Sequence, residues 1–288
     1  MGAEIMNPRM LERMRVACRM AAECLSMVGE HIRPGLTTEE INTLVHDWTV
    51  GHDAIPSPLN YGNPPYPKSV CTSVNACVCH GIPSERDVLK DGDNVNVDVT
   101  LYYPSEHGFH GDTSATFYVG EPSEEAKRVV ETARWCLELG VATVHEGARV
   151  RDIGRAIQEY AEAQGCSVVR DFVGHGVGRQ FHMPPQVPHY YEPNARKRLR
   201  RGTTFTIEPM INVGDYRTEI QSDHWTVLTR DRSLSAQFEH TLAVTRGGVE
   251  VLTARPTLLV NSEDKPWAKL GALTVPAAGA AALVAAEE

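Results

Sequence analysis

The sequence predicts an α+β domain with pseudo-twofold symmetry, built from two diverged copies of a helix–helix–strand unit. Two long amphipathic patterns predict the first helices, and each is followed by a glycine break and a second helix. Two strand-like segments, each with an acidic residue six positions after a glycine, complete the copies. The 288-residue chain is 42% hydrophobic and 23% charged, which is typical of a globular protein with a sizeable core.

The first helix of each copy is predicted over residues 8–28 and 123–139. In both segments apolar residues recur at three-to-four spacing, the pattern of a helix with one buried face. These residues are Met10, Met14, Ala17, Ala21 and Leu25 in the first segment, and Ala126, Val129, Val130, Ala133 and Leu137 in the second.

A glycine-containing break follows each of these helices, at residues 34–41 and 146–153. In both breaks an isoleucine lies six residues after the glycine, where a second helix is predicted to run. A threonine in the first break is predicted to cap the helix that follows, because its hydroxyl can accept a hydrogen bond from a free backbone N–H group of the first helical turn.

The strands of the two copies are predicted at residues 95–99 and 205–208. Asp98 lies six residues after Gly92, and Glu208 lies six residues after Gly202. The glycines of the two breaks, Gly35 and Gly147, are separated by nearly the same number of residues as the glycines before the two strands, Gly92 and Gly202. A repeat of this kind places a carboxylate-bearing strand from each half opposite the other, across the core.

The net charge of −9 argues against a nucleic-acid-binding protein, because phosphate recognition needs a concentrated basic surface. The densest basic run, residues 196–201, is short, and we interpret it as a solvated loop. Residues 1–30 contain several charges and no uninterrupted apolar stretch, so no secretory signal is predicted. The stretch at 270–286 is too weakly apolar for a membrane span, and no membrane association is expected.

The seven cysteines are odd in number, and no secretory signal is predicted. We therefore expect reduced thiols in the cytoplasm rather than a disulfide framework. Beyond residue 254 the repeat pattern stops, and the tail at 255–288 is rich in alanine. A lone helix there would have little to pack on, so we expect poor order and no catalytic role.

Five residues combine into a candidate metal site: Asp98, Asp112, His175, Glu208 and Glu239. Each alone says little, because an acidic residue at a strand end is more often a turn or capping group. Together, four carboxylates on hydrophobic strands would repel one another and would be costly to bury without cations. Two divalent ions would balance the four negative charges, with His175 as a neutral nitrogen donor. Oxygen-rich ligation with one imidazole suits Mn²⁺, Fe²⁺, Co²⁺ or Zn²⁺.

Five separated motifs resemble those of the type I methionine aminopeptidases in content, order and approximate spacing. They are Val78-Cys79-His80-Gly81-Ile82-Pro83, Gly111-Asp112-Thr113-Ser114, Gly174-His175-Gly176-Val177-Gly178, Phe205-Thr206-Ile207-Glu208-Pro209-Met210 and Phe238-Glu239-His240-Thr241. The resemblance covers residues 8–253 and is closest to the short bacterial form. It implies the pita-bread fold, an antiparallel sheet covered by helices, with a catalytic domain over residues 1–254.

The resemblance implies a role for each residue of the site. Asp112 and Glu239 would bridge the two metals, Asp98 would chelate one of them, and His175 with Glu208 would complete the other ligand set. A hydroxide bridging the metals would attack the carbonyl of the substrate's first residue, with Glu208 as the general base. His182 would stabilise the developing oxyanion, and His80 would hold the scissile amide. The glycines around His175 would let peptide and metal come close.

The implied activity is removal of the initiator methionine from nascent proteins whose second residue is small. Residues carried over from the family would form an apolar slot for the methionine side chain: Tyr66, Cys71, Phe181 and Trp225. Cys71 is equally consistent with an inert buried thiol. The resemblance also implies a monovalent cation near Asn75 and Cys77, with Ser235 contributing. The expected partner is the N-terminal peptide of nascent proteins, bound by a monomer, and a contact with the ribosome stays open.

The chain departs from the family pattern at three places. Asn63 stands where an aromatic residue is common, Ala76 replaces a frequent acidic residue, and the hairpin between Asp98 and Asp112 is longer. The first departure puts the wall of the slot in question. The longer hairpin is expected only to extend a surface turn.

Rival interpretations stay open at this point. A proline-specific aminopeptidase or prolidase would share the fold, but those enzymes carry a large additional N-terminal domain. A non-catalytic relative that binds proteins or nucleic acid would be expected to lose metal ligands, whereas all five candidates are present. A metal-storage protein would need neither His80 nor His182 beside the ions. His240 is predicted to point to the opposite strand face from Glu239 and is assigned a structural role.

Overall fold

The helices follow the two copies predicted from the sequence. In the computed structural model, which describes residues 4–255, the first copy begins with α1 (Pro8–Gly29) and α2 (Thr38–Gly51). The second copy begins with α3 (Glu124–Ala142) and α4 (Val150–Ala163). The predicted helices at 8–28 and 123–139 are therefore confirmed to within a few residues.

Capping side chains begin three of these helices. The Asn7 side chain accepts the Met10 N–H at 2.9 Å at the start of α1, and Ser123 Oγ accepts a backbone N–H at the start of α3. At α2 the predicted threonine cap is Thr37, which exchanges hydrogen bonds with Glu40 in a capping box. The polar residue before each apolar stripe thus fixes where the helix begins.

The strands are short apart from one long hairpin, and they pair antiparallel throughout residues 4–255. They are β1 (Ile55–Pro56), β2 (Cys71–Val74), β3 (Cys77–Cys79), β4 (Asn94–Tyr103), β5 (Phe109–Tyr118), β6 (Ser167–Val168), β7 (Gly174–Gly176), β8 (Met183–Val187), β9 (Thr204–Ile207), β10 (Met210–Asn212), β11 (Thr218–Ile220), β12 (Val227–Thr229), β13 (Ser235–Gln237), β14 (His240–Thr245) and β15 (Gly248–Val251). In one sheet β4 lies between β2 and β5, and another has the order β15-β14-β9-β7-β8.

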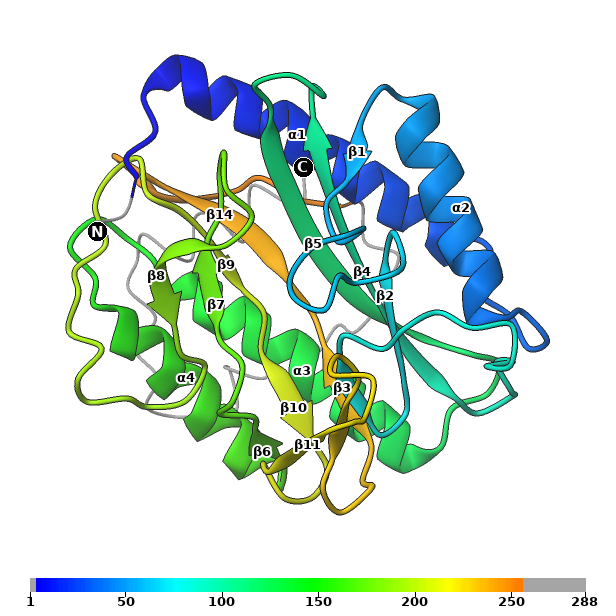
Figure 1. Ribbon diagram of the computed structural model, residues 1–288. Helices are drawn as coiled ribbons and strands as arrows, with labels where there is room; N and C mark the ends of the chain where they lie inside the picture. Colours follow the sequence, from blue (N-terminus) through cyan, green and yellow to red (C-terminus); the bar gives the residue numbers. More distant parts are fainter. Residues whose placement is uncertain (1–3, 256–288) are drawn as a thin grey trace.

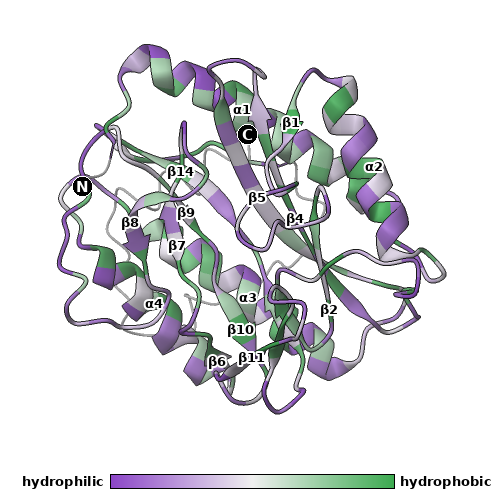
Figure 2. Cartoon of the chain, viewed as in Figure 1, coloured by the Kyte–Doolittle hydropathy of each residue, from purple (hydrophilic) through white to green (hydrophobic). Residues whose placement is uncertain are grey.

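The first helix of each copy packs on strands of its own copy. Figure 1 shows α1 behind β4 and β5, and α3 behind β10, and α3 also contacts β13. In Figure 2, α2 and α4 carry both hydrophilic and hydrophobic positions, as helices with one buried face do. No helix within residues 4–255 is long and apolar enough to cross a bilayer.

Strand β4 joins the two copies because its two faces differ. One face carries valines that are fully buried in the main core. On the other face, Asn94 and Asn96 donate side-chain hydrogen bonds to the backbone carbonyl oxygens of Ser235 and Gln237 in β13, at 2.8 and 2.9 Å. A polar seam of β4 amides against β13 carbonyls therefore connects the copies.

The predicted catalytic domain over residues 1–254 and its separate tail stay predictions. The tail at 255–288 lies outside the described residues, apart from Arg255.

Candidate active site

The β4–β5 hairpin brings two predicted metal ligands to one face of its sheet. Asp98 lies in β4 opposite Ser114, and Asp112 lies in β5 opposite Thr100. Because Asp98 and Thr100 are two residues apart, they share a face, and Asp112 shares it with them. The hairpin register alone thus makes the two aspartates diagonal neighbours.

Glu239 reaches the same place through the polar seam. The Asn96 side chain is hydrogen-bonded to the Gln237 carbonyl oxygen. Glu239 lies two residues beyond Gln237, and Asp98 lies two residues beyond Asn96, so the two carboxylates follow the same hydrogen bond. The Glu239 N–H donates to the Ser114 carbonyl oxygen at 3.0 Å. The Thr113 hydroxyl donates to the Glu239 carbonyl oxygen at 2.9 Å. The backbone of Glu239 is therefore held against β5 from both sides.

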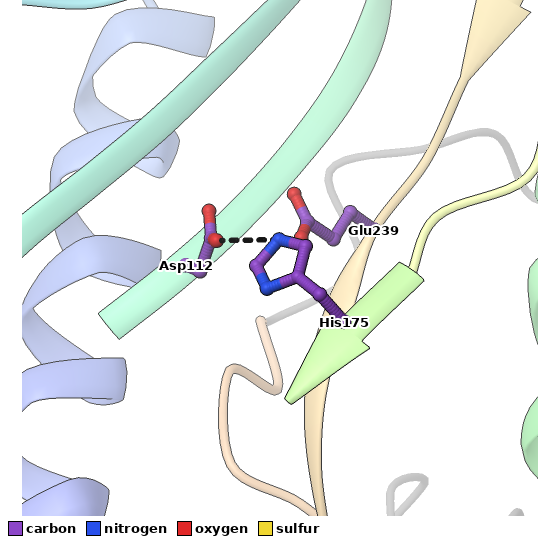
Figure 3. Close-up of side chains that lie close together, drawn as sticks. All are labelled: Asp112, His175 and Glu239. Carbon is purple, nitrogen blue, oxygen red and sulfur yellow. Dashed lines mark ion pairs between the residues drawn. The ribbon is translucent and has the colours of Figure 1, made fainter. Parts of the chain in front are cut away.

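His175 and Glu208 come from the sheet of the second copy. His175 is the central residue of β7, and Glu208 directly follows β9, which is the neighbour of β7. His175 Nε2 lies 3.5 Å from Glu208 Oε1 and 3.7 Å from Asp112 Oδ2. In Figure 3, the Asp112 and Glu239 carboxylates converge on the His175 ring from separate segments. Ligand atoms of these three residues all lie within 4.8 Å of one another.

The glycines on either side of His175 have a different function from the one predicted. A Cβ atom at Gly174 would lie 2.4 Å from the Thr206 carbonyl oxygen in β9, and one at Gly176 would lie 2.2 Å from the Pro184 carbonyl oxygen in β8. Both positions therefore need glycine so that the flanking strands can approach. The prediction that they make room for peptide and metal was wrong, because neighbouring backbone already fills that space.

The pKa values of the carboxyl groups indicate whether the cluster suits cations. Burial raises the pKa of Asp112 to about 7. Burial, together with the charge of Asp112, raises the pKa values of Asp98, Glu208 and Glu239 well above their usual range. The Asp98 Oδ1 atom is buried without a hydrogen-bond partner within residues 4–255. Four carboxylates, two of them buried and two partly buried, with an unpartnered oxygen and one imidazole, fit divalent cations, which would relieve their repulsion.

Burial also keeps His175 neutral, with a pKa lowered to about 4. A neutral imidazole has a lone pair available for a metal, so the residue suits its predicted function as a nitrogen donor. His240 lies outside the cluster, and its Nδ1 atom is 2.9 Å from the Thr253 hydroxyl, in keeping with the structural role assigned to it.

Several residues that hold the ligands were not recognised from the sequence. The Thr206 hydroxyl donates to Glu208 Oε1 at 2.7 Å, and Gln237 Nε2 lies 3.3 Å from Glu208 Oε2. The buried His189 accepts the Glu208 backbone N–H at its Nε2 atom, at 3.1 Å. Thr206 carries a sequence signal, since it lies two residues before Glu208 on a strand. His189 carries none, because its contact depends on how distant segments pack.

Arg255 lies behind Glu239 and was also missed. Its guanidinium donates to the Thr113 hydroxyl and to the Ser114 carbonyl oxygen. Burial lowers the pKa of Arg255 to about 10, while the negative charge of Glu239 opposes that shift. A buried cation thus balances part of the negative charge of the carboxylate cluster.

A cavity of about 780 Å³ opens onto the carboxylates and is lined by every residue predicted for the site. Besides the five candidate ligands, these are His80, His182, Tyr66, Cys71, Phe181 and Trp225. The rings of Tyr66 and Trp225 meet edge to face with centroids 5.3 Å apart. Cys71 is buried and pairs with Asp98 across β2 and β4, so its thiol belongs to a cavity wall. Their individual functions remain predictions.

His80 enters the cavity from an unusual backbone conformation. Its φ is +55°, in the left-handed region that few non-glycine residues adopt. The next residue, Gly81, packs so closely that a Cβ atom there would lie 2.1 Å from the Thr72 carbonyl oxygen. The ring stands edge to face on Phe172, with centroids 5.4 Å apart. Burial lowers the pKa of His80 to about 4, so its imidazole is neutral.

The departures from the family pattern are accommodated locally. In the run around Asn63, Gly62 packs under Trp225, where a Cβ atom would lie 2.5 Å from the indole, and the Pro64 carbonyl oxygen accepts the Trp225 Nε1–H at 3.0 Å. The cavity wall here is therefore built around Trp225, with Asn63 in place of an aromatic residue. The extra length of the hairpin lies in the turn between β4 and β5, at residues 104–108.

The segment expected to bind a monovalent cation is brought together in part. The Ser235 N–H donates to the Asn75 carbonyl oxygen at 2.9 Å. Cys77 lies in the adjacent β3 with its Sγ 3.7 Å from the Cys79 carbonyl oxygen. The cation itself stays a prediction. All seven cysteines of the chain are free and buried, in agreement with the expected reduced thiols.

Comparison with known proteins agrees with this geometry. A family model described as metallopeptidase family M24 matches residues 12–246. The chain is 51% identical to methionine aminopeptidase A from Synechocystis sp. over 249 residues, which make up 86% of this chain and 96% of that relative.

Solved structures give the same result. The crystal structure of methionine aminopeptidase from Rickettsia prowazekii has a TM-score of 0.83 and 45% identity, and the match covers 87% of this chain and 99% of that one. The prolidase from Pyrococcus horikoshii has a TM-score of 0.71 at 20% identity, and the match covers 89% of this chain and 65% of the prolidase chain. At this identity the likeness shows the fold alone. The predicted pita-bread fold is confirmed by these neighbours. The chain belongs to metallopeptidase family M24 and, within it, to the methionine aminopeptidases.

Proposed function

We propose that this protein releases the initiator methionine from nascent proteins whose second residue is small. The observation that carries the proposal is that the carboxylate–histidine cluster and an apolar slot open into one cavity. A methionine side chain in the slot beside Tyr66 and Trp225 would bring the carbonyl of the first residue to the cluster. Binding and hydrolysis would then take place in a single cavity.

Two divalent ions would be held by Asp98, Asp112, His175, Glu208 and Glu239. Mn²⁺, Co²⁺, Fe²⁺ and Zn²⁺ are the candidates for this oxygen-rich donor set with one imidazole. When bound, such ions supply Lewis acidity to water and to the scissile carbonyl. A monovalent cation beside Asn75, Cys77 and Ser235 is a further part of the proposal.

The chain's own residues carry out the proton transfers and the positioning. Glu208 takes a proton from the attacking water and delivers it to the departing amine, held for this by Thr206. His182 donates a hydrogen bond to the carbonyl oxygen as negative charge develops on it. His80 holds the scissile amide, and its neutral ring suits a hydrogen bond to a neutral group.

We place the enzyme in the cytoplasm as a monomer that acts on N-terminal peptides, without binding nucleic acid as a substrate. Its seven free, buried thiols support the reducing compartment. A contact with the ribosome would deliver substrates to the cavity as they emerge.

The experiment that tests this function is methionine release from Met-Gly-Xaa and Met-Ala-Xaa peptides, with and without added Mn²⁺ or Co²⁺. An Xaa-Pro peptide and a chelator-treated sample run alongside. Metal-dependent release of methionine with no cleavage of Xaa-Pro is the expected result. Cleavage of Xaa-Pro alone would favour a prolidase-like enzyme, and no release with any metal would favour a non-catalytic relative.

A further inference from the structure

A tyrosine outside the predicted site is hydrogen-bonded to one of the three histidines that line the cavity. Tyr61 Oη lies 2.8 Å from His182 Nδ1, and both residues line the cavity. The two rings are 5.1 Å apart between centroids, and Tyr61 also packs on Phe181 at 4.9 Å. The phenol thus contacts His182 through both its hydroxyl and its ring.

The loop that carries Tyr61 is closed by its own backbone. The Asn60 N–H donates to the Tyr66 carbonyl oxygen, and the Tyr66 N–H donates to the Tyr61 carbonyl oxygen, both at 2.8 Å. Pro64 fastens the same loop to Trp225 through the 3.0 Å hydrogen bond from the indole. Although the Tyr61 side chain is 39% exposed, its backbone is therefore held at both ends.

The hydrogen bond decides what His182 can offer a substrate. A neutral imidazole carries one N–H and one lone pair, and the partner of one nitrogen determines which of them the other presents. Across the part of the chain that the structure describes, Tyr61 is the hydrogen-bond partner of Nδ1, and no partner occupies Nε2. Nε2 is therefore the nitrogen left to meet a ligand in the cavity.

We propose that Tyr61 is a positioning residue whose hydroxyl donates to His182 Nδ1 and so keeps the proton on Nε2, facing the substrate carbonyl. This inference rests on the proposed function, since a carbonyl oxygen can only accept a hydrogen bond. The centroid of the His182 ring also lies 4.1 Å from that of the His175 ring, so His182 stands beside the carboxylate–histidine cluster where the substrate carbonyl would be placed.

The test is Tyr61→Phe, which removes the hydroxyl and keeps the ring. The matched control is Tyr191→Phe, another partly exposed tyrosine, whose ring packs under Arg155 outside the cavity. In the methionine-release assay, Tyr61→Phe is expected to lower kcat about three- to tenfold with KM within about twofold, because a net hydrogen bond in the transition state is lost. The control is expected to match the parent protein.

A second readout reports on the tautomer itself. Two-bond ¹H–¹⁵N spectra of histidine-labelled, Zn²⁺-loaded protein show which ring nitrogen carries the proton, and His182→Ala assigns the signal. The parent is expected to show the proton on Nε2, and Tyr61→Phe a mixture of both tautomers. A proton on Nδ1 in the parent, or an unchanged tautomer in Tyr61→Phe, would overturn the inference whatever happens to kcat. If the parent releases no methionine, the proposed function fails while the tautomer result still stands.

Discussion

The Thr100 hydroxyl donates a 2.6 Å hydrogen bond to Asp112 Oδ1 from the neighbouring strand. The bond orients the carboxylate so that its other oxygen, Oδ2, lies on the side of His175. Replacing Thr100 with valine keeps the shape and removes the donor. We expect divalent-ion affinity to fall about 10- to 100-fold, as when partners of metal ligands are lost. Calorimetric titration with Mn²⁺ measures it.

The control for that change is Thr43→Val. Among residues 4–255, the Thr43 hydroxyl bonds only the backbone of its own helix, at the Glu39 carbonyl oxygen, on the surface of α2. Its Mn²⁺ affinity should equal that of the parent. Equal affinity in Thr100→Val as well would mean that the hairpin register alone orients Asp112.

A methyl group at Gly81 is expected to disturb His80 next to it. The Cβ atom of Gly81→Ala would lie 2.1 Å from the Thr72 carbonyl oxygen, so the backbone must shift at a cost of about 1–3 kcal/mol. Because the shift moves His80, kcat should fall together with the free energy of unfolding. Gly51→Ala at the end of α2 meets no atom within 4 Å and should preserve both quantities. Denaturant unfolding and methionine release compare the two variants, and wild-type kcat in Gly81→Ala would contradict this role of the glycine.

The carboxyl group of Asp112 is expected to contribute stability to the metal-free protein that is lost as the pH rises from about 4 to about 7. Asp112 has a pKa of about 7 in the fold and 3.8 when exposed to water, so the native state binds more protons at this group across the window. Its contribution to stability then falls with increasing pH, because the folded carboxyl group must ionise next to its neighbours. The imidazoles of His175 and His80, whose pKa values burial lowers to about 4, act in the opposite direction, so a comparison with Asp112→Asn is needed to isolate the effect. Chemical denaturation of chelator-treated parent and Asp112→Asn protein at several pH values measures the difference in slope.

Saturating Zn²⁺ or Mn²⁺ should reverse the contribution of Asp112, because cations favour the ionised carboxylate and bind only the folded site. Equal slopes in the metal-free parent and the metal-free Asp112→Asn protein over the same window would show that Asp112 is already ionised without metal.

Glu208→Gln and Asp112→Asn are expected to fail in different ways. Glu208→Gln removes the proton carrier and should lower kcat about 10²- to 10⁴-fold, with the fold retained. Asp112→Asn removes one charged ligand and should appear first as a reduced metal content of the purified protein. Elemental analysis and circular dichroism separate these outcomes. A fully active Glu208→Gln variant would exclude Glu208 as the general base.

Much of the fold was predictable because it follows local rules. The apolar stripes of α1 and α3 and the Thr37 cap depend on neighbours within four residues. The paired glycines and acidic residues of the repeat then indicated that Asp98 and Glu208 face each other. Motif resemblance supplied the remaining ligands and the slot.

The supporting residues were harder to predict because their functions arise only from packing between distant segments. Tyr61, His189 and Arg255 contact the site through partners 121, 19 and 142 residues away. Nothing in the periodicity around them marks such contacts. The glycines beside His175 were misassigned for the same reason, since the strands that crowd them lie elsewhere in the sequence.

The polar seam sets an order of events during synthesis. The chain leaves the ribosome from its N-terminus, so β4 emerges long before β13. The Asn94 amide must wait for a carbonyl oxygen 141 residues further along, and Asp98 must wait for Glu239. Until that late segment has been made, the cavity lacks Glu239, one of the five predicted metal ligands. A newly made molecule therefore gains its full ligand set only after Glu239 has joined the hairpin that emerged long before it.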